Sequence, residues 1–261
     1  MKIILPRIFI SISIILINII LFAISPLFGK NPIPKNTSQI ILVLTQNDTS
    51  FKGTLYRFNG NNQTSNWEKT ENPIDVVIGR KGLAWGLGLH NQTNDLLPQK
   101  KEGDGKSPAG IFKLEQIFGF PPKNEIGNLK LPYIHVTELM ECIDDVNSKY
   151  YNQIIQRDHA DNVDWHSSEK MLDIGPIYKY GVVVSHNNHP IINGEGSCIF
   201  LHIWRGPSRP TIGCTAMNIE AMKSIIYWLD EKKNPLLVQL TESLYKKFKT
   251  SWGLPNISLP E

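Results

Sequence analysis

Short strand-like segments separated by turn residues dominate the sequence from Gln39 onward. They are rich in β-branched and aromatic residues, and clusters of Asn, Gly and Pro lie between them. This pattern is typical of β-strands and turns. The predicted strands are residues 39–45, 53–60, 65–70, 74–79, 179–186, 196–203 and 236–240. The sequence therefore predicts a mainly β fold with flanking helices, an α+β class.

Two segments are predicted to be helical. Asn218 can cap a helix in which Ile219, Met222, Ile225, Ile226 and Leu229 recur at helical spacing. The more polar middle of the chain, residues 138–171, is expected to mix short helices with loops, and residues 148–157 form one candidate helix.

The N-terminus differs from the rest of the chain. Lys2 and Arg7 precede residues 8–29, which carry no charge. That length fits either a cleaved secretory signal or an uncleaved membrane anchor of about 20 residues. We predict a signal or anchor over residues 1–30, a linker over 31–36, a catalytic domain over 37–241 and a C-terminal extension over 242–261. Either N-terminal reading exports the domain to the periplasm or cell envelope, anchored to the inner membrane if the segment is retained.

Composition excludes several classes of function. The hydrophobic fraction of 41% and charged fraction of 20% are those of a globular protein. A net charge of +3, with no basic stripe interleaved with aromatic residues, argues against a nucleic-acid partner.

The motif "FLHIWRGPSRPTIGCTAM", residues 200–217, holds the candidate catalytic pair His202 and Cys214. Alternation along the strand places Cys198, Phe200 and His202 on one face. The Gly and Pro residues that follow let the chain fold back, so that Cys214 returns beside His202. An imidazole that takes the proton of a thiol makes a thiolate nucleophile. The backbone N–H groups around Gly213 and Thr215 are candidates for binding an oxyanion.

The three cysteines divide into one nucleophile and one pair. An odd number in an oxidising compartment allows one internal bridge and leaves one thiol. Cys198 lies roughly 13 Å from His202 along the strand, and Cys142 belongs to no nucleophile motif. Cys214 is therefore the predicted free thiol. Cys142 and Cys198 are then available for a disulfide, with two buried reduced thiols as the alternative.

The motif resembles the active-site motif of the L,D-transpeptidases, the YkuD-type family. Residues 79–89, 101–112 and 196–206 also resemble segments of one branch of that family, in the same order. The resemblance matches His202 to the family's base, Cys214 to its nucleophile, Thr211 to its Ser/Thr and Gly213 to the glycine before the cysteine. It implies an L,D-transpeptidase-like β-sandwich.

The motif also departs from the common family pattern. Ile203 replaces a glycine, Ile212 replaces a second histidine, and Ala216 stands where the pattern has an arginine. Arg205 and Arg209 are candidate replacements for that charge and would bind a peptide carboxylate, or they are solvated loop cations. Trp204 is either a wall of the cleft or part of the core.

The resemblance implies acyl transfer on peptidoglycan stem peptides. Cys214 would form a thioester, and a second stem peptide or a lipoprotein would supply the acceptor amine. Neither a metal nor an organic cofactor is expected. The alternatives are a peptidoglycan or lipoprotein-linkage hydrolase using the same site, and a non-catalytic wall-binding domain. A zinc peptidase built on His186 and His189 ranks last. Asp144 and Asp145 either hold a substrate amine or cap loops.

Overall fold

A computed structural model describes residues 31–61, 64, 66–90 and 96–259 of the chain. The segment predicted as a signal or anchor, residues 1–30, lies outside the described residues. Within the described ranges, no helix has the length and apolar character needed to cross a bilayer.

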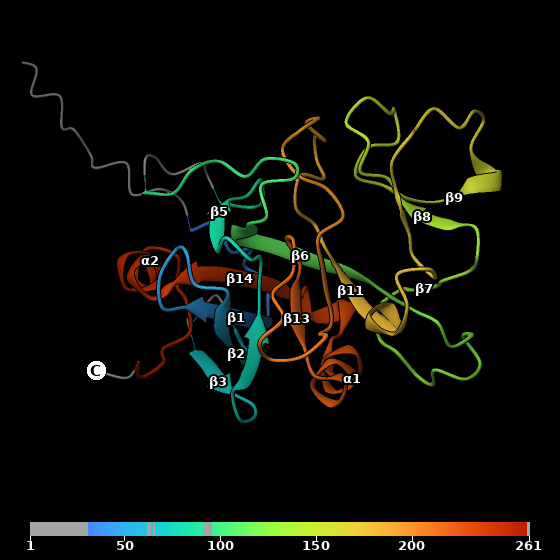
Figure 1. Ribbon diagram of the computed structural model, residues 1–261. Coiled ribbons are helices and arrows are strands. Elements are labelled where there is room, and N and C mark those ends of the chain that lie inside the picture. Colours follow the sequence, from blue (N-terminus) through green and yellow to red (C-terminus); the bar gives the residue numbers. More distant parts are fainter. Residues whose placement is uncertain (1–30, 62–63, 65, 91–95, 260–261) are drawn as a thin grey trace, which may run out of the picture.

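Most of the described strands join one large sheet (Figure 1). They are β1 Gln39–Thr45, β2 Lys52–Asn61, β3 Asn66–Lys69, β4 Ile74–Val77, β5 Leu83–Trp85, β6 Ser107–Gly119, β7 Tyr133–His135, β11 Tyr180–Val184, β12 Phe200–Ile203, β13 Thr215–Met217 and β14 Leu236–Thr241. All seven predicted strands are present, which confirms a mainly β fold. The strand predicted at 196–203 is shorter than expected, because Cys198 has a φ of 52° and lies before β12.

The strand pairing closes this sheet on itself. The order β1-β14-β6-β11-β12-β13-β4-β2 runs around the described part of the molecule, and β2 pairs again with β1. A sandwich would have two sheets without hydrogen bonds between them. The structure therefore has a barrel-like sheet in place of the expected sandwich. Within it, β1–β14 and β12–β13 are parallel pairs, and the second of these carries the motif residues.

Aliphatic and aromatic side chains fill the barrel. Every residue of β1 and of β14 is buried. The two described α-helices, α1 Ile219–Trp228 and α2 Glu242–Phe248, add to the same core. The Asn218 side chain accepts a hydrogen bond from the Ala221 N–H, which confirms the predicted cap and start of α1. α1 packs on β11 and β12, and α2 packs on β14 and β1.

A segment inserted between β6 and β11, residues 120–179, contributes β7 to the large sheet and otherwise forms a separate small sheet beside the barrel. Its strands are β8 Met140–Cys142, β9 Ile154–Gln156 and β10 Glu169–Lys170, in the order β10-β8-β9. Figure 1 shows it to one side of the barrel strands. The helix predicted at 148–157 is wrong: turns and β9 occupy that stretch. Its apolar residues pair with β8 instead. We call residues 120–179 the insertion.

A buried carboxylate holds the insertion together. Glu141 accepts hydrogen bonds from Trp165 Nε1 at 2.7 Å, Ser168 Oγ at 2.6 Å and Arg157 at 2.7 Å. Burial acts to raise the pKa of Glu141, but these donors outweigh it and the pKa is lowered. The carboxylate is therefore ionised, and these three hydrogen-bond donors all belong to the insertion.

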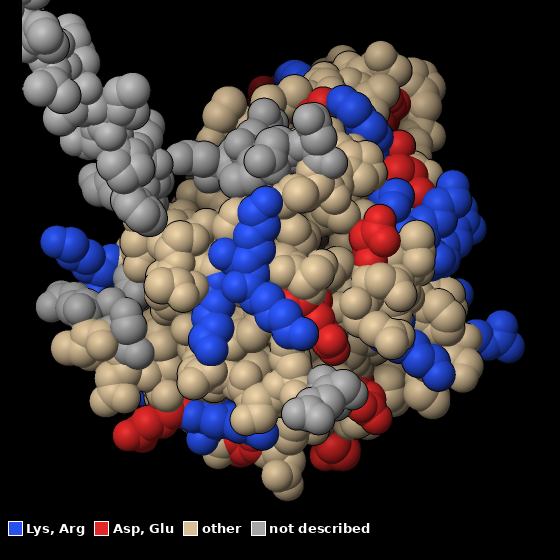
Figure 2. Space-filling view, turned by 90° about the vertical axis from the view of Figure 1, so that its left-hand side faces the viewer, with Lys and Arg blue, Asp and Glu red and all other residues tan. Residues whose placement is uncertain are grey.

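Charges of both signs are spread over the surface. Figure 2 shows the side on which α2 lies, with Lys and Arg side chains grouped near the middle of that face and Asp and Glu side chains scattered around them. The C-terminal turn of α2 contains Lys246 and Lys247, both exposed.

Candidate active site

His202 and Cys214 lie on neighbouring parallel strands. β12 pairs with β13 so that Leu201 is opposite Thr215 and His202 is opposite Ala216. Extended by one residue, this register sets Cys214 opposite Phe200. Because side chains alternate along each strand, Cys214 and His202 are on the same face, as diagonal neighbours about 7–8 Å apart.

Both side chains line one cavity of about 180 Å³. Two parts of the chain form its walls. From the insertion come Glu169, Ile174, Ile177 and Tyr178. From the motif come His202, Trp204, Arg205, Arg209, Pro210, Thr211, Ile212, Cys214 and Ala216. The structure thus brings the predicted nucleophile, base and substrate-binding residues together, and it adds a wall that sequence analysis missed.

The hydrogen bonds of the Cys214 thiol go to backbone groups. The sulfur accepts from the Phe200 N–H at 3.3 Å and donates to the Cys198 carbonyl at 3.4 Å. No hydrogen bond joins it to the His202 ring among the described contacts. Burial and the nearby Glu169 carboxylate raise the pKa of this thiol well above its usual value. At rest the thiol is therefore neutral, and it must turn within the cavity to reach the imidazole.

The His202 ring is fixed in one tautomer. Its Nδ1 lies 2.8 Å from the Ile203 carbonyl, and a carbonyl can only accept, so Nδ1 carries the hydrogen. Burial lowers the pKa of His202 to about 4, assisted by the charge of Arg205. The ring is neutral at pH 7, and its Nε2 has a lone pair available for a proton.

The turn before the nucleophile is held by two hydroxyl groups. Thr211 Oγ1 donates to the Cys214 carbonyl at 2.6 Å and accepts from the Gly213 N–H at 3.2 Å. Ser107 Oγ, at the start of β6, donates to the carbonyls of Gly213 and Cys214 at 2.6 and 3.1 Å. Thr211 therefore shapes the turn, and Ser107 is a supporting residue that sequence analysis missed.

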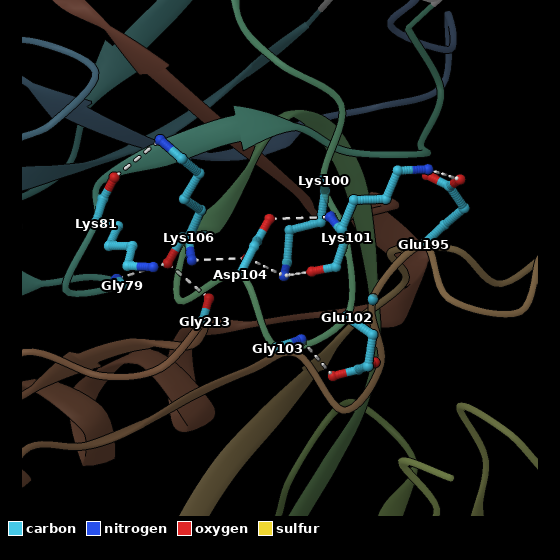
Figure 3. A network of polar contacts seen from close by, with 12 residues as sticks. Gly79, Lys81, Lys100, Lys101, Glu102, Gly103, Asp104, Lys106, Glu195 and Gly213 are labelled. Carbon is cyan, nitrogen blue, oxygen red and sulfur yellow. Dashed lines mark hydrogen bonds and ion pairs between the residues drawn. The ribbon is translucent and has the colours of Figure 1, made fainter. Parts of the chain in front are cut away.

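The glycine-rich turn before Ser107 is ordered by one carboxylate, as Figure 3 shows. Asp104 accepts from Lys100 Nζ at 2.6 Å and from the backbone N–H groups of Lys101 and Lys106 at 2.9 and 2.8 Å. Lys100 is buried, and its charge also acts to lower the pKa of Cys214. The turn thus leads Ser107 to the Cys214 backbone.

The N–H groups around the nucleophile are differently engaged. The Gly213 N–H donates to Thr211, and Thr215 begins β13, where it pairs with Leu201. Among the described contacts, the Cys214 N–H has no acceptor. The Cys214 N–H is therefore available to a developing oxyanion.

The family model for the YkuD L,D-transpeptidase catalytic domain matches residues 43–238. The chain belongs to this family. None of the curated proteins matches the sequence significantly. Among solved structures, the chain is similar to the helical cell shape determining protein Pgp2 from Campylobacter jejuni, at 14% identity with a TM-score of 0.34. That match covers 80% of this chain and 52% of the other, so this chain spans about half the length of that protein.

Two of the three residues that depart from the family's common pattern, Ile212 and Ala216, line the cavity, and Ile203 is buried outside it. Ile212, at the position of the second histidine, is 68% exposed. Ala216, at the position of the arginine, is buried and lies opposite His202 in the pairing of β12 with β13. Arg205 and Arg209 line the same cavity and are exposed, and Trp204 is half-buried as part of its wall.

The insertion supplies two further residues of this YkuD site. The Tyr178 hydroxyl donates to Glu169 Oε2 at 2.6 Å, and its ring lies 5.3 Å from the His202 ring, edge to face. Tyr178 also acts on Cys214 to lower the pKa of the thiol. Neither residue belongs to a motif, and they approach Cys214 only through the folding of the insertion.

A disulfide fastens the insertion beside the nucleophile. Cys142 of β8 and Cys198 form it, with an S–S distance of 2.07 Å, and Cys214 is the free cysteine. Asn152 accepts from the Cys198 N–H at 3.0 Å. The carbonyl that accepts from the Cys214 thiol is thus held in place by a covalent bond and a hydrogen bond from the insertion.

The remaining candidates have structural partners. His186 is buried, accepts from the Leu87 N–H at 3.1 Å and lies 2.9 Å from the Glu195 carbonyl. Asp145 accepts from the N–H groups of Asn147 and His166, and Asp144 accepts from Ser167 Oγ. In the described ranges, no group of three or more His, Cys, Asp or Glu could hold a metal ion.

Proposed function

We propose that this YkuD domain is an exported cysteine acyltransferase that acts on peptidoglycan stem peptides. The observation that carries the proposal is the pairing of β12 with β13. It puts the Cys214 thiol and a neutral imidazole with a free Nε2 on one face, at one cavity. These are the parts that nucleophilic acyl transfer requires.

The first half-reaction forms a thioester. The thiol turns from the Cys198 carbonyl toward His202, whose Nε2 takes the proton. The sulfur attacks the carbonyl between the third residue and the terminal D-alanine, and the Cys214 N–H donates to the oxyanion. The C–N bond then breaks, and the nitrogen of D-alanine leaves with the proton that His202 returns.

The second half-reaction releases the acyl group. The acceptor amine, from a second stem peptide or a lipoprotein, gives a proton to His202 as it attacks the thioester. The carbon–sulfur bond breaks, and the thiolate regains the proton from His202. If water attacks instead, the products are a shortened stem peptide and free enzyme, which is the hydrolase alternative.

The mouth of the cavity fits an anionic peptide. Arg205 and Arg209 would bind a substrate carboxylate, since a guanidinium matches its two oxygens. Trp204 and the exposed Ile212 would cover apolar parts of the donor. Export to the periplasm, through a signal or anchor in residues 1–30, would bring the domain to this substrate.

One observation favours a non-catalytic wall-binding domain. The thiol is hydrogen-bonded to backbone groups and its pKa is raised, so the resting site lacks a thiolate. In that case the cavity would bind stem peptides and leave them unchanged.

Incubation of purified residues 31–261 with disaccharide-tetrapeptide tests the proposal. We expect loss of D-alanine with a cross-linked dimer, and no turnover by Cys214→Ala or His202→Gln. Ser208→Ala, an exposed change in the same loop, is the matched control and should keep activity. Tripeptide without dimer would mean a hydrolase. Unchanged tetrapeptide with wild-type protein that binds it would mean a binding domain.

A further inference from the structure

Glu169 and Tyr178 form a connected pair that reaches the nucleophile from the insertion. Both line the cavity of Cys214 and His202. The Tyr178 hydroxyl faces two groups: it donates to Glu169 Oε2 at 2.6 Å, and it acts on the Cys214 thiol in the same cavity to lower the pKa of the thiol. The acyl-transfer steps above use neither residue.

The single proton of Tyr178 can serve only one of these neighbours at a time. When Glu169 is ionised, it accepts that proton, and the tyrosine oxygen can then only accept from the thiol S–H. A thiolate needs the opposite arrangement, with Tyr178 donating to the sulfur. That arrangement is consistent with a protonated Glu169, whose own O–H donates to the tyrosine oxygen.

The charges around Glu169 also oppose a thiolate. Asp144 and Glu102 are the charged groups that act on Glu169, and both are negative. Within the described residues, no ion pair involves Glu169, and Arg205 and Arg209 line the cavity from the motif side. An ionised Glu169 would place a further negative charge beside the sulfur. The positive charge of Lys100 has the opposite effect and lowers the pKa of the Cys214 thiol.

We propose that Glu169 is a positioning residue that controls the Cys214 nucleophile through Tyr178. In its protonated form it holds Tyr178 so that the phenol donates to the thiolate. In its ionised form it accepts the hydrogen bond of the Tyr178 hydroxyl, which leaves no donor for a thiolate and keeps Cys214 as a thiol. The inference rests on the proposed function, because it concerns activation of the same nucleophile.

Protons balance in this scheme without an external partner. The thiol proton moves to His202 Nε2, as in the first half-reaction. The protons of Glu169 and Tyr178 stay on their own oxygens and only change the direction in which they point. Burial and the neighbouring carboxylates raise the pKa of Glu169 to about 7, so both forms are populated near neutral pH.

The rate of Cys214 alkylation by iodoacetamide, a small uncharged reagent, measures this control without any substrate. The disulfide stays intact under non-reducing conditions, and peptide mapping assigns the label to Cys214. With Glu169→Gln, a neutral side chain that can donate to Tyr178, we expect alkylation at pH 7.5 to rise about tenfold, equivalent to one unit of thiol pKa. Glu138→Gln, an exposed change in the insertion, is the matched control and should leave the rate unchanged.

The double variant shows whether Tyr178 transmits the effect. In a Tyr178→Phe background, Glu169→Gln should accelerate alkylation less than threefold. An equal acceleration with and without the tyrosine hydroxyl would show that Glu169 acts by charge alone and would overturn the proposal. An unchanged rate in folded Glu169→Gln would overturn it as well.

The wild-type protein gives a second measurement that needs no variant. Alkylation should rise less than tenfold per pH unit between about pH 6 and 8, because Glu169 loses its proton there and opposes the thiolate. A full tenfold rise per unit through this range would contradict the inference. If alkylation of Cys214 depends on Glu169 and on pH as described but the tetrapeptide is not turned over, only the proposed function is rejected. If the tetrapeptide is turned over normally but alkylation does not depend on Glu169, only this inference is rejected.

Discussion

The barrel and the insertion are stabilised in different ways. The barrel buries continuous apolar strands, so that β1 and β14 have no exposed residue. The insertion has short strands, and hydrogen bonds to buried carboxylates such as Glu141 and Asp145 connect its segments. A disulfide and a small apolar cluster, which includes Phe118, Cys142, Tyr178, Phe200 and Cys214, join the two parts.

The reacting groups lie in the barrel, and the groups proposed to control the nucleophile lie in the insertion. Cys214 and His202 stand on paired barrel strands, where packing fixes their positions. Glu169 and Tyr178 come from the insertion, which the disulfide and the small apolar cluster join to the barrel. The site lies at the border, so a change in either part should affect chemistry, but only changes in the barrel should unfold the whole domain.

The largest effect is expected from a cavity in the barrel. Phe112 is fully buried in β6 against the rings of His90 and His186. Phe112→Ala should lower the free energy of unfolding by about 3–5 kcal/mol, with faster hydrogen exchange throughout the barrel. Ile219→Ala, at a position 37% exposed, is the control, with a change of about 1 kcal/mol or less. A similar loss in both variants would contradict the described core.

Removal of the disulfide should have the next largest effect, confined to the insertion. The bridge closes a loop with a sequence separation of 56 residues, and its loss in Cys142→Ala/Cys198→Ala should cost about 2–4 kcal/mol. Hydrogen exchange should accelerate over β8, β9 and β10 while β1 and β14 stay protected. Equal acceleration in barrel and insertion would remove the distinction between them.

A smaller effect is expected from the polar centre of the insertion. Glu141→Gln leaves one amide where an ionised carboxylate accepts from Arg157, Trp165 and Ser168. We expect a loss of about 1–3 kcal/mol in local stability, measured by exchange of β8 amides. Glu138→Gln, exposed near the same strand, should change little. If both variants behave alike, the carboxylate does not hold the insertion.

Acid should weaken the two parts in different pH ranges. Burial lowers the pKa of His90, His186 and His202 to about 4, whereas each is near 6.5 when unfolded. Between these values the unfolded chain binds more protons, so the barrel loses stability as pH falls from 6.5 toward 4, by about 1.4 kcal/mol per pH unit for each proton. Hydrogen bonds from backbone and side-chain groups lower the pKa of Asp145 and Asp164, so the insertion loses their contribution only below about pH 4.

Urea unfolding at pH 7, 6 and 5 checks this prediction. His186→Gln should reduce the slope of stability against pH, and His159→Gln, exposed in the insertion, should keep it. A stability independent of pH between 7 and 5 would show that these imidazoles are not held neutral by burial.

The sequence predicts the barrel better than the insertion. Runs of β-branched and aromatic residues located β11 and β12, and the Asn218 cap located α1, because these signals are local. The same local pattern suggested a helix at 148–157, where pairing with β8 decides for a strand. It also could not reveal the closure of the barrel, which depends on β1 meeting β2 and β14 together.

The candidate site shows the same contrast between residues that a local pattern predicts and residues that only the fold brings together. The motif places His202, Thr211 and Cys214, which lie within one 18-residue stretch, residues 200–217. Ser107, Glu169 and Tyr178 approach Cys214 from other parts of the chain and stand in no pattern of their own. Cysteine parity suggested the pair Cys142 and Cys198, but only the fold brings them together.

The most direct measurement is the intact mass of the protein during reaction with a tetrapeptide stem. We predict a covalent adduct in which the donor has lost its terminal D-alanine, mapped to Cys214 and absent in Cys214→Ala. Addition of an amine acceptor should remove the adduct and release the transfer product. A folded wild-type protein that binds the stem without forming an adduct, or an adduct that persists in Cys214→Ala, would contradict the assignment of Cys214 as the nucleophile.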